Sequence, residues 1–409
     1  MPGDVILQLR QTRQSTYDYR WVVLAVATLA QATASFVTQG LGILAGFLQQ
    51  DFQLSNLQVG LLIAAANAAS IVALPIVGDL LDRRSERLIV AIGAAILTTG
   101  VLLSVLGTSF VWLLASLFIV GCGYSTTQPG GSKSVTAWFH GRQLGFAMGI
   151  RQAGLPLGAA GAAAILPVIA SIWSWRAALL IGAAAALSGA LAFSALYRRP
   201  SAASADPNRR SPPALGLAAL LAMLGHPWMR GVALSGIALV SAQYAILTYF
   251  MLFLRDDHFI PLADGAWLMF AAQSCGVAGR VALGAWSDRP GRSRFWFVIA
   301  SMLAVGLGLL ALALLHSQMP LWVWIIIAAW LGFFGLGWYG PWIAFIAEVS
   351  PPDRLGLALG TAMSLNQIAV VATPPVLGLL HDLTGSYVAV WSCLVALLAA
   401  AIWGARGTK

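Results

Sequence analysis

The chain has 409 residues, of which 59% are hydrophobic and only 9% are charged, and its formal net charge is +9. Soluble domains contain about 25% charged residues, so this composition excludes an ordinary soluble protein. Apolar runs long enough to cross a bilayer recur along the whole chain, whereas a β-barrel would show short alternating segments. The sequence therefore predicts an all-α, polytopic membrane protein.

The apolar runs predict twelve transmembrane helices in two sets of six. Their spans are 20–48, 56–79, 87–107, 110–138, 143–170 and 174–197, then 229–254, 263–287, 294–315, 320–348, 356–380 and 387–404. A polar, basic stretch at 198–213 separates the sets, and the short apolar stretch 214–224 is expected to lie at the interface or to extend helix 7. The predicted domains are an N-terminal tail (1–19), a first bundle (20–197), a linker (198–228), a second bundle (229–404) and a C-terminal tail (405–409).

The charged residues of the loops predict the orientation. Most basic residues fall in the tails, the linker and alternate loops, whereas the opposite loops hold little beyond Arg176 and Arg255. Cytoplasmic loops carry the excess of Lys and Arg, so both termini are predicted to be cytoplasmic, in the cytoplasmic (inner) membrane. This pattern explains the positive charge without a nucleic-acid partner. No cleaved signal peptide is predicted before the first apolar run.

Two short motifs occur once in each half, in the same order. GDLLDRRSER at 78–87 matches GAWSDRPGR at 284–292, after the second helix of each half. RQLGFAMG at 142–149 matches RLGLALG at 354–360, at the start of the fifth helix of each half. Ordered repeats of this kind predict two parallel six-helix halves, which is a transporter architecture.

These motifs resemble the major facilitator superfamily, over essentially the whole chain. The loop signature of that family, Gly-x-x-x-Asp-Arg-x-Gly-Arg, is matched well by the second copy, whereas the first copy has Ser85-Glu86 where a glycine is common. The resemblance implies two six-helix bundles that rock around a central cavity and expose it alternately to each side. It also implies that helices 1, 4, 7 and 10 line the cavity, with contributions from helices 2, 5, 8 and 11.

The motif residues are predicted to gate the cytoplasmic side. Asp82 and Asp288 each end a helix beside arginines that could pair with the neighbouring bundle, and Glu348 is a candidate partner. Such pairs hold one side closed and break when it opens. Alternatively, these charges only anchor the topology. The predicted gating residues are Gly78, Asp82, Arg83, Arg87, Gly284, Asp288, Arg289, Arg292 and Glu348.

The charges inside the membrane indicate the substrate class. All 14 acidic residues fall in tails, loops or helix ends, whereas Arg151 and Arg280 lie within apolar runs. At about 1.5 Å per residue, both lie roughly 12–13 Å from the nearest loop, close to the middle of a ~30 Å hydrocarbon core. A buried guanidinium without a carboxylate partner favours an anionic ligand, which it binds through bidentate hydrogen bonds. Alternatively, Arg151 could snorkel or cap carbonyls around Pro156, and Lys133 could reach the interface.

Polar and aromatic residues on the expected lining helices complete a predicted cavity for a small organic anion. Any single one of them could instead serve helix packing. The predicted substrate-binding residues are Arg280, Arg151, Tyr124, Gln128, Gln243, Tyr244, Trp338, Tyr339, Asn366 and Gln367. In the repeat, the position 206 residues before Arg280 is Leu74, so the fold does not require an arginine there.

The stretch WFHGRQLGFAMGIRQAGLPLG at 138–158 and the helix-8 arginine resemble the monocarboxylate and oxalate–formate branches of that superfamily. In those branches the helix-8 arginine binds the carboxylate, and this implies the same role for Arg280. Two features depart from the branches. Gly276 stands where many monocarboxylate carriers have an aspartate, and helix 11 has Asn366 and Gln367 where the oxalate–formate branch has a lysine. The prediction is a secondary active or facilitative transporter of mono- or dicarboxylates.

Other functions fit the sequence less well. GLPLG at 154–158 weakly resembles a motif of multidrug/proton antiporters, but such exporters use buried carboxylates. A receptor or scaffold on the same fold has no sequence feature in its favour, and an enzyme would need a nucleophile, base or metal constellation. No cofactor, metal or catalytic residue is predicted. The expected partners are the anion, a counter-anion or proton, and the lipid bilayer, and the chain is expected to be a monomer.

Overall fold

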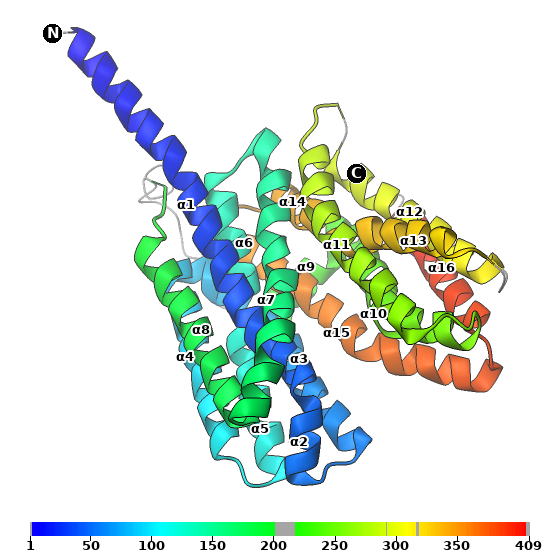
Figure 1. Ribbon diagram of the computed structural model, residues 1–409. Coiled ribbons are helices and arrows are strands. Elements are labelled where there is room, and N and C mark those ends of the chain that lie inside the picture. Colours follow the sequence, from blue (N-terminus) through cyan, green and yellow to red (C-terminus); the bar gives the residue numbers. More distant parts are fainter. Residues whose placement is uncertain (1, 201–216, 292, 316–318, 406–409) are drawn as a thin grey trace.

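The computed structural model describes residues 2–200, 217–291, 293–315 and 319–405 (Figure 1). All regular secondary structure in these residues is helical. Twelve of the described helical segments are long and apolar enough to cross a membrane, which confirms the predicted number of spans.

The first half of the chain forms one bundle. Serines start four of its helices: the side chains of Ser55, Ser85, Ser109 and Ser174 each accept a hydrogen bond from the backbone N–H three residues later. The helices of this bundle are α1 (Pro2–Ile43), α2 (Ala45–Phe52), α3 (Asn56–Arg83), α4 (Glu86–Leu106), α5 (Phe110–Tyr124), α6 (Thr127–Trp138), α7 (Leu144–Ile172) and α8 (Trp175–Leu196).

The second half forms the other bundle, preceded by a short helix. Residues 201–216, which include most of the predicted linker, lie outside the described residues. The helices are α9 (Leu217–Gly225), α10 (Pro227–Asp256), α11 (Leu262–Ser287), α12 (Arg294–Leu314), α13 (Leu321–Leu331), α14 (Tyr339–Val349), α15 (Leu355–Thr384) and α16 (Tyr387–Gly404).

The helix bounds differ from the predicted spans at the start of each half. α1 begins at Pro2, so a helix occupies the segment predicted to be a tail. It ends at Ile43, and the remainder of the predicted first span belongs to α2. α9 is a separate helix rather than an extension of helix 7, because α10 starts anew with Pro227 in its first turn.

Two of the twelve spans are interrupted near prolines. The fourth span is divided into α5 and α6 at Ser125 and Thr126, just before Pro129. The tenth span is divided into α13, a π-helix (Gly332–Leu336) and α14, whose first turn contains Pro341. Proline removes a backbone donor and clashes with the preceding turn, so both interruptions follow from its ring.

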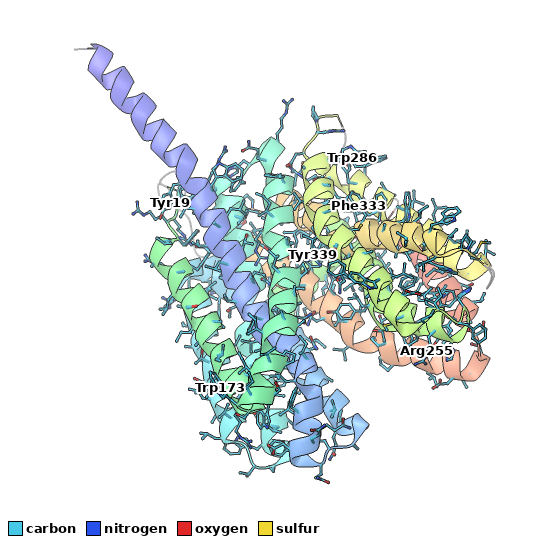
Figure 2. The ribbon with its side chains drawn as sticks, in the orientation of Figure 1. Tyr19, Trp173, Arg255, Trp286, Phe333 and Tyr339 are labelled. Carbon is cyan, nitrogen blue, oxygen red and sulfur yellow. The ribbon has the colours of Figure 1, made fainter. Side chains whose placement is uncertain are left out.

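The two bundles meet at the end that carries the repeated motifs and diverge toward the opposite end (Figure 1). We call the first end the termini side, because both chain ends lie there. Contacts between the bundles join α3 to α15, α7 to α11 and α14, and α6 to α14 and α15. Figure 2 places Tyr339 between the bundles, whereas Trp173 and Arg255 lie at the diverging ends. The central site is therefore built from both halves.

A buried histidine follows α10 on the side opposite the termini. His258 is 9% exposed, and its ring centroid lies 4.5 Å from Phe253 and 4.4 Å from Trp324. Burial lowers the pKa of His258, although Asp257 opposes this effect in part. The apolar surroundings disfavour the protonated imidazolium, which is the physical cause.

We expect acid to destabilise the protein through His258. Since its pKa is lower in the folded state than the unfolded value of about 6.5, the unfolded chain binds more protons, and stability falls as the pH drops through that value. The melting temperature in detergent should be lower at about pH 5.5 than at about pH 7.5. His258→Gln should reduce this difference, and an unchanged difference in the variant would contradict the assignment.

Candidate functional site

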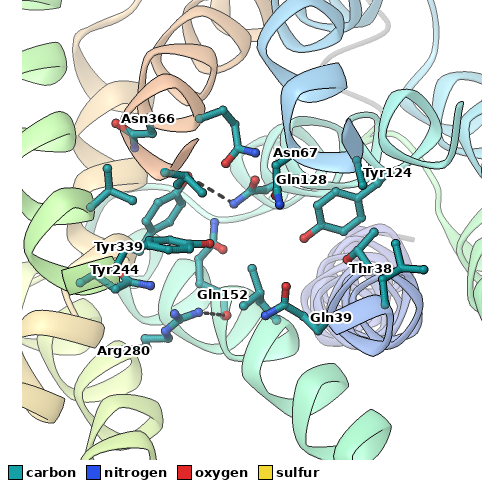
Figure 3. A pocket seen from close by; sticks show the side chains of 17 residues that line it. Thr38, Gln39, Asn67, Tyr124, Gln128, Gln152, Tyr244, Arg280, Tyr339 and Asn366 are labelled. Atoms are coloured by element: carbon teal, nitrogen blue, oxygen red, sulfur yellow. Dashed lines mark hydrogen bonds between the residues drawn. The ribbon is translucent and has the colours of Figure 1, made fainter. Parts of the chain in front are cut away.

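A cavity lies between the two bundles and is lined by residues of both (Figure 3). Its volume of about 80 Å³ admits only a small ligand in this conformation, since drug-sized ligands need roughly 300–1,000 Å³. Among the described residues that line it, Arg280 is the one with a charged side chain, so the cavity suits one negative charge. The polar lining residues are Thr38, Gln39, Asn67, Tyr124, Gln128, Gln152, Gln243, Tyr244, Arg280, Tyr339, Asn366 and Gln367.

The two interrupted spans deliver side chains to this cavity. Gln128 lies in the first turn of α6, directly after the break at Ser125 and Thr126. Tyr339 is the first residue of α14, directly after the π-helix. Gln128 Nε2 donates a hydrogen bond to Tyr339 Oη at 3.3 Å, which joins the two bundles across the cavity. Departures from regular helix often accompany binding sites in this way.

Arg280 extends from α11 toward the opposite bundle and is 6% exposed. Its Nε donates to the carbonyl of Leu336 at 3.0 Å, and its Nη1 donates to the carbonyl of Gln152 at 2.6 Å. Leu336 belongs to the same bundle, whereas Gln152 lies in α7 of the other. Among the described residues no hydrogen bond is made by Nη2 and no carboxylate pairs with this guanidinium. The Nη2 amino group is therefore left for a ligand. The positive charge of the guanidinium is in contact with neutral carbonyls and with no described carboxylate.

Arg151 does not line the cavity, which differs from the predicted direct contact with substrate. It is fully buried in α7, and its Nη2 donates to Gln31 Oε1 and to the carbonyls of Thr127 and Gln128, at 3.1, 2.8 and 2.7 Å. These partners all belong to the first bundle: Gln31 lies in α1, and the two carbonyls lie in the first turn of α6. Arg151 thus holds the first turn of α6 from behind the cavity wall.

The second predicted residue that lies behind the wall is Trp338. Its indole is fully buried and donates to Gln243 Oε1 at 3.0 Å, so it orients a lining amide without reaching the cavity. The other eight predicted substrate-binding residues line the cavity: Arg280, Tyr124, Gln128, Gln243, Tyr244, Tyr339, Asn366 and Gln367. Asn67 and Gln152 also line it and were not predicted. Asn67 is the one carboxamide in the apolar run 61–77, which is a signal that the sequence contains.

The motif aspartates make hydrogen bonds from one bundle to the other. The carboxylate of Asp288 accepts from the backbone N–H groups of Gly145 and Phe146, at 2.7 and 2.8 Å. The carboxylate of Asp82 accepts from Gly356 and Leu357 at the same two distances. Each aspartate therefore caps the fifth helix of the opposite bundle, where free N–H groups and the helix dipole favour an anion.

Each aspartate also has a cationic partner. Lys133 Nζ pairs with Asp82 at 2.6 Å and donates to the carbonyl of Leu81. Lys133 therefore lies where the bundles meet on the termini side, and not at the cavity. Arg294 pairs with Asp288 at 2.9 Å and donates to the carbonyl of Gly141 in the other bundle. Arg294 was not among the predicted gating residues, although its place directly after the motif loop is a usable signal.

The arginines of the motif and Glu348 differ from the predicted pairing. Arg83 pairs with Asp79 on its own helix at 2.7 Å, and Glu348 pairs with Arg294 of its own bundle at 3.0 Å. The remaining motif arginines take other positions: Arg289 lies over the Trp286 ring, Arg87 is exposed, and Arg292 lies outside the described residues. The hydrogen bonds between the bundles are made instead by the carboxylates of Asp82 and Asp288. Each carboxylate lies next to the unpaired N–H groups at the start of a helix in the opposite bundle.

Glycines let the bundles touch backbone to backbone on the termini side. A Cβ atom on Gly284 would lie 2.3 Å from the carbonyl oxygen of Gly145, and one on Gly78 would lie 2.3 Å from that of Gly356. Cβ atoms essentially never come closer than 3.0 Å to such a neighbour, so a side chain at either glycine would push the two backbones apart. The two contacts are related by the internal repeat and close the same side of the molecule.

Comparisons with known sequences agree with this architecture. The family model described as Major Facilitator Superfamily matches residues 27–343. An uncharacterised MFS-type transporter of Mycobacterium tuberculosis is 29% identical over 387 residues, covering 93% of this chain and 84% of that protein. The probable galactarate/D-glucarate transporter of Bacillus subtilis is 21% identical (90% and 87% covered), and monocarboxylate transporter 11 of Mus musculus is 27% identical (90% and 82% covered).

The fold is also found among solved structures. The crystal structure of an MFS transporter, FucP, in the outward conformation superposes with a TM-score of 0.77 at 18% identity, covering 96% of this chain and 99% of that one. At this identity the likeness concerns the fold alone. The family match over most of the chain and the twelve spans identify the protein as a multi-pass membrane transporter rather than an enzyme. The protein belongs to the major facilitator superfamily.

Proposed function

We propose that the protein transports small organic anions, mono- or dicarboxylates, across the cytoplasmic membrane by alternating access, and that Arg280 binds the carboxylate. The observation that carries this proposal is the state of Arg280: within the described part of the chain, its Nη2 has no partner and no other charged side chain lines the cavity. A charged group is costly inside the membrane and marks a functional site, and an anion is the ligand that satisfies this one.

The comparisons support the same substrate class. Two of the relatives are named for carboxylates, one as a monocarboxylate transporter and one as a probable galactarate/D-glucarate transporter. With the termini in the cytoplasm, as the positive-inside distribution indicates, the closed contacts lie on the cytoplasmic side. The conformation described here then receives its ligand from the outside.

We expect monocarboxylates to be transported in preference to dicarboxylates of similar size. Arg280 is the one cation of the described lining, so a second carboxylate would be buried without a partner, which costs several kcal/mol. Uptake of labelled acetate, lactate, oxalate and succinate into proteoliposomes would measure this preference. Faster uptake of both dicarboxylates would show that the cavity holds a second cation in another conformation.

The coupling can be measured in the same proteoliposomes. An imposed pH gradient tests proton symport, and vesicles preloaded with an unlabelled anion test exchange. The lining residues that the structure describes include no acid or histidine, so a transported proton would have to travel on the substrate carboxylate. Movement of cationic amphipathic drugs without any carboxylate uptake would support the alternative, a multidrug/proton antiporter.

A further inference from the structure

One of the two carbonyls that bind Arg280 is left without a helical partner by a proline. In an α-helix the carbonyl of residue i accepts from the N–H of residue i+4, and for Gln152 that residue is Pro156. Leu336 is the last residue of the π-helix, so its carbonyl lies where that helix ends. Pro156 has no N–H, so Nη1 of Arg280 supplies the donor that the carbonyl of Gln152 lacks.

The two bonds have different consequences. The bond to Leu336 stays within the second bundle and orients the side chain of Arg280. The bond to Gln152 crosses to α7 of the first bundle and therefore holds the bundles together beside the cavity. It lies close to the backbone contact of Gly149, where a Cβ atom would come 2.2 Å from the carbonyl oxygen of Arg280.

We propose that the carbonyl of Gln152, opened by Pro156, is a latch that holds Arg280 across the bundles in the empty transporter and is exchanged for the substrate carboxylate. Nη2 is already free, so a carboxylate that binds Nη1 and Nη2 together competes with the carbonyl of Gln152 for Nη1. A carboxylate makes a stronger hydrogen bond to a guanidinium than a neutral carbonyl does, so the exchange is favourable. The exchange rests on the proposed function, whereas the latch itself does not.

The latch links binding to the conformational change. Substrate that occupies Nη1 removes one of the hydrogen bonds that join the bundles, and the closed contact on the termini side is weakened only when the site is filled. Pro156 acts through Arg280 and is thus a positioning residue. The internal repeat supports a dedicated role, because neither residue recurs in the other half. The position equivalent to Pro156 is Gln367, 211 residues later, and the position equivalent to Arg280 is Leu74, 206 residues earlier.

The latch can be tested without any substrate. Spin labels at Arg142→Cys and Asp353→Cys, two exposed positions on the termini side of opposite bundles, report the closing distance after Cys122, Cys275 and Cys393 are replaced by serine. Pro156→Ala restores an N–H to the carbonyl of Gln152 and should raise the ratio of long to short distances about three- to tenfold. The control is Pro167→Ala in the same helix, which restores an N–H to a carbonyl that no described side chain binds.

A double-mutant cycle separates the latch from a general effect on α7. Arg280→Gln should raise the same ratio, and Pro156→Ala should then add nothing, because the two changes break one bond. Equal distance distributions for the wild type, Pro156→Ala and Pro167→Ala would overturn the latch, as would additive effects of Pro156→Ala and Arg280→Gln. The proposed function would survive either result if Arg280→Gln still abolishes carboxylate uptake.

Discussion

Arg280→Gln is expected to abolish the uptake of every carboxylate that the wild type transports. The variant keeps a polar side chain but loses the charge, so a bound carboxylate would be buried without a cation. Truncating one partner of a buried charge pair costs about 2–5 kcal/mol, which corresponds to a loss of roughly 30-fold or more in transport. Initial rates in proteoliposomes, normalised to the amount of inserted protein, would measure this loss.

The matched control for this experiment is Arg84→Gln. This substitution removes the same charge from an exposed position on the termini side. Its uptake should stay near that of the wild type. Arg280→Lys should recover only part of the activity, because a lysine cannot replace the planar fork that reaches two carbonyls and a ligand. Undiminished uptake of all anions by Arg280→Gln would show that another group binds the substrate.

The second large effect is expected from a single methyl group on the termini side. In Gly284→Ala, the new Cβ would lie 2.3 Å from the carbonyl oxygen of Gly145, so α7 and α11 would have to separate. Overpacking of this kind costs about 1–3 kcal/mol, which would reduce the ratio of closed to open conformations about 5- to 150-fold. Transport should fall accordingly, because alternating access needs both conformations.

Gly306→Ala is the control, since a Cβ there would meet nothing nearer than 4.0 Å. Alanine favours helix over glycine by about 0.5–1 kcal/mol at both positions, so only the interbundle contact distinguishes the two variants. The distance between spin labels on the two bundles should lengthen in Gly284→Ala and stay unchanged in Gly306→Ala. If Gly284→Ala closes normally, the contact of α7 with α11 is not the one that limits closure.

The fold could be predicted from the sequence because a membrane imposes simple length and polarity rules. Apolar runs of sufficient length fixed the number of spans, and the repeated motifs placed them in two halves. The bounds were less certain where the chain leaves the regular pattern. α1 begins at Pro2 although the sequence there is polar, and the first predicted span is divided at Leu44 between α1 and α2.

The candidate site was predicted in part because depth in the membrane follows from position along a helix, whereas direction does not. Arg151 and Gln152 are neighbours at the same depth, but successive residues point about 100° apart around the axis. Gln152 consequently lines the cavity, and Arg151 points into its own bundle. The gating residues could likewise be predicted only in part. The sequence identified the motif aspartates, but the backbone N–H groups that they accept from belong to a distant helix end, whose position the sequence does not give.

The sequence by itself determined the class of this protein: a twelve-helix transporter, with cationic and no acidic side chains deep in its apolar runs. These properties are local, because hydropathy and charge are read residue by residue. Only the tertiary structure decided which of the two deep arginines faces the cavity and which carbonyls hold it. That choice depends on the rotation of each helix and on the approach of the two bundles, which long-range packing sets and no short stretch of sequence encodes.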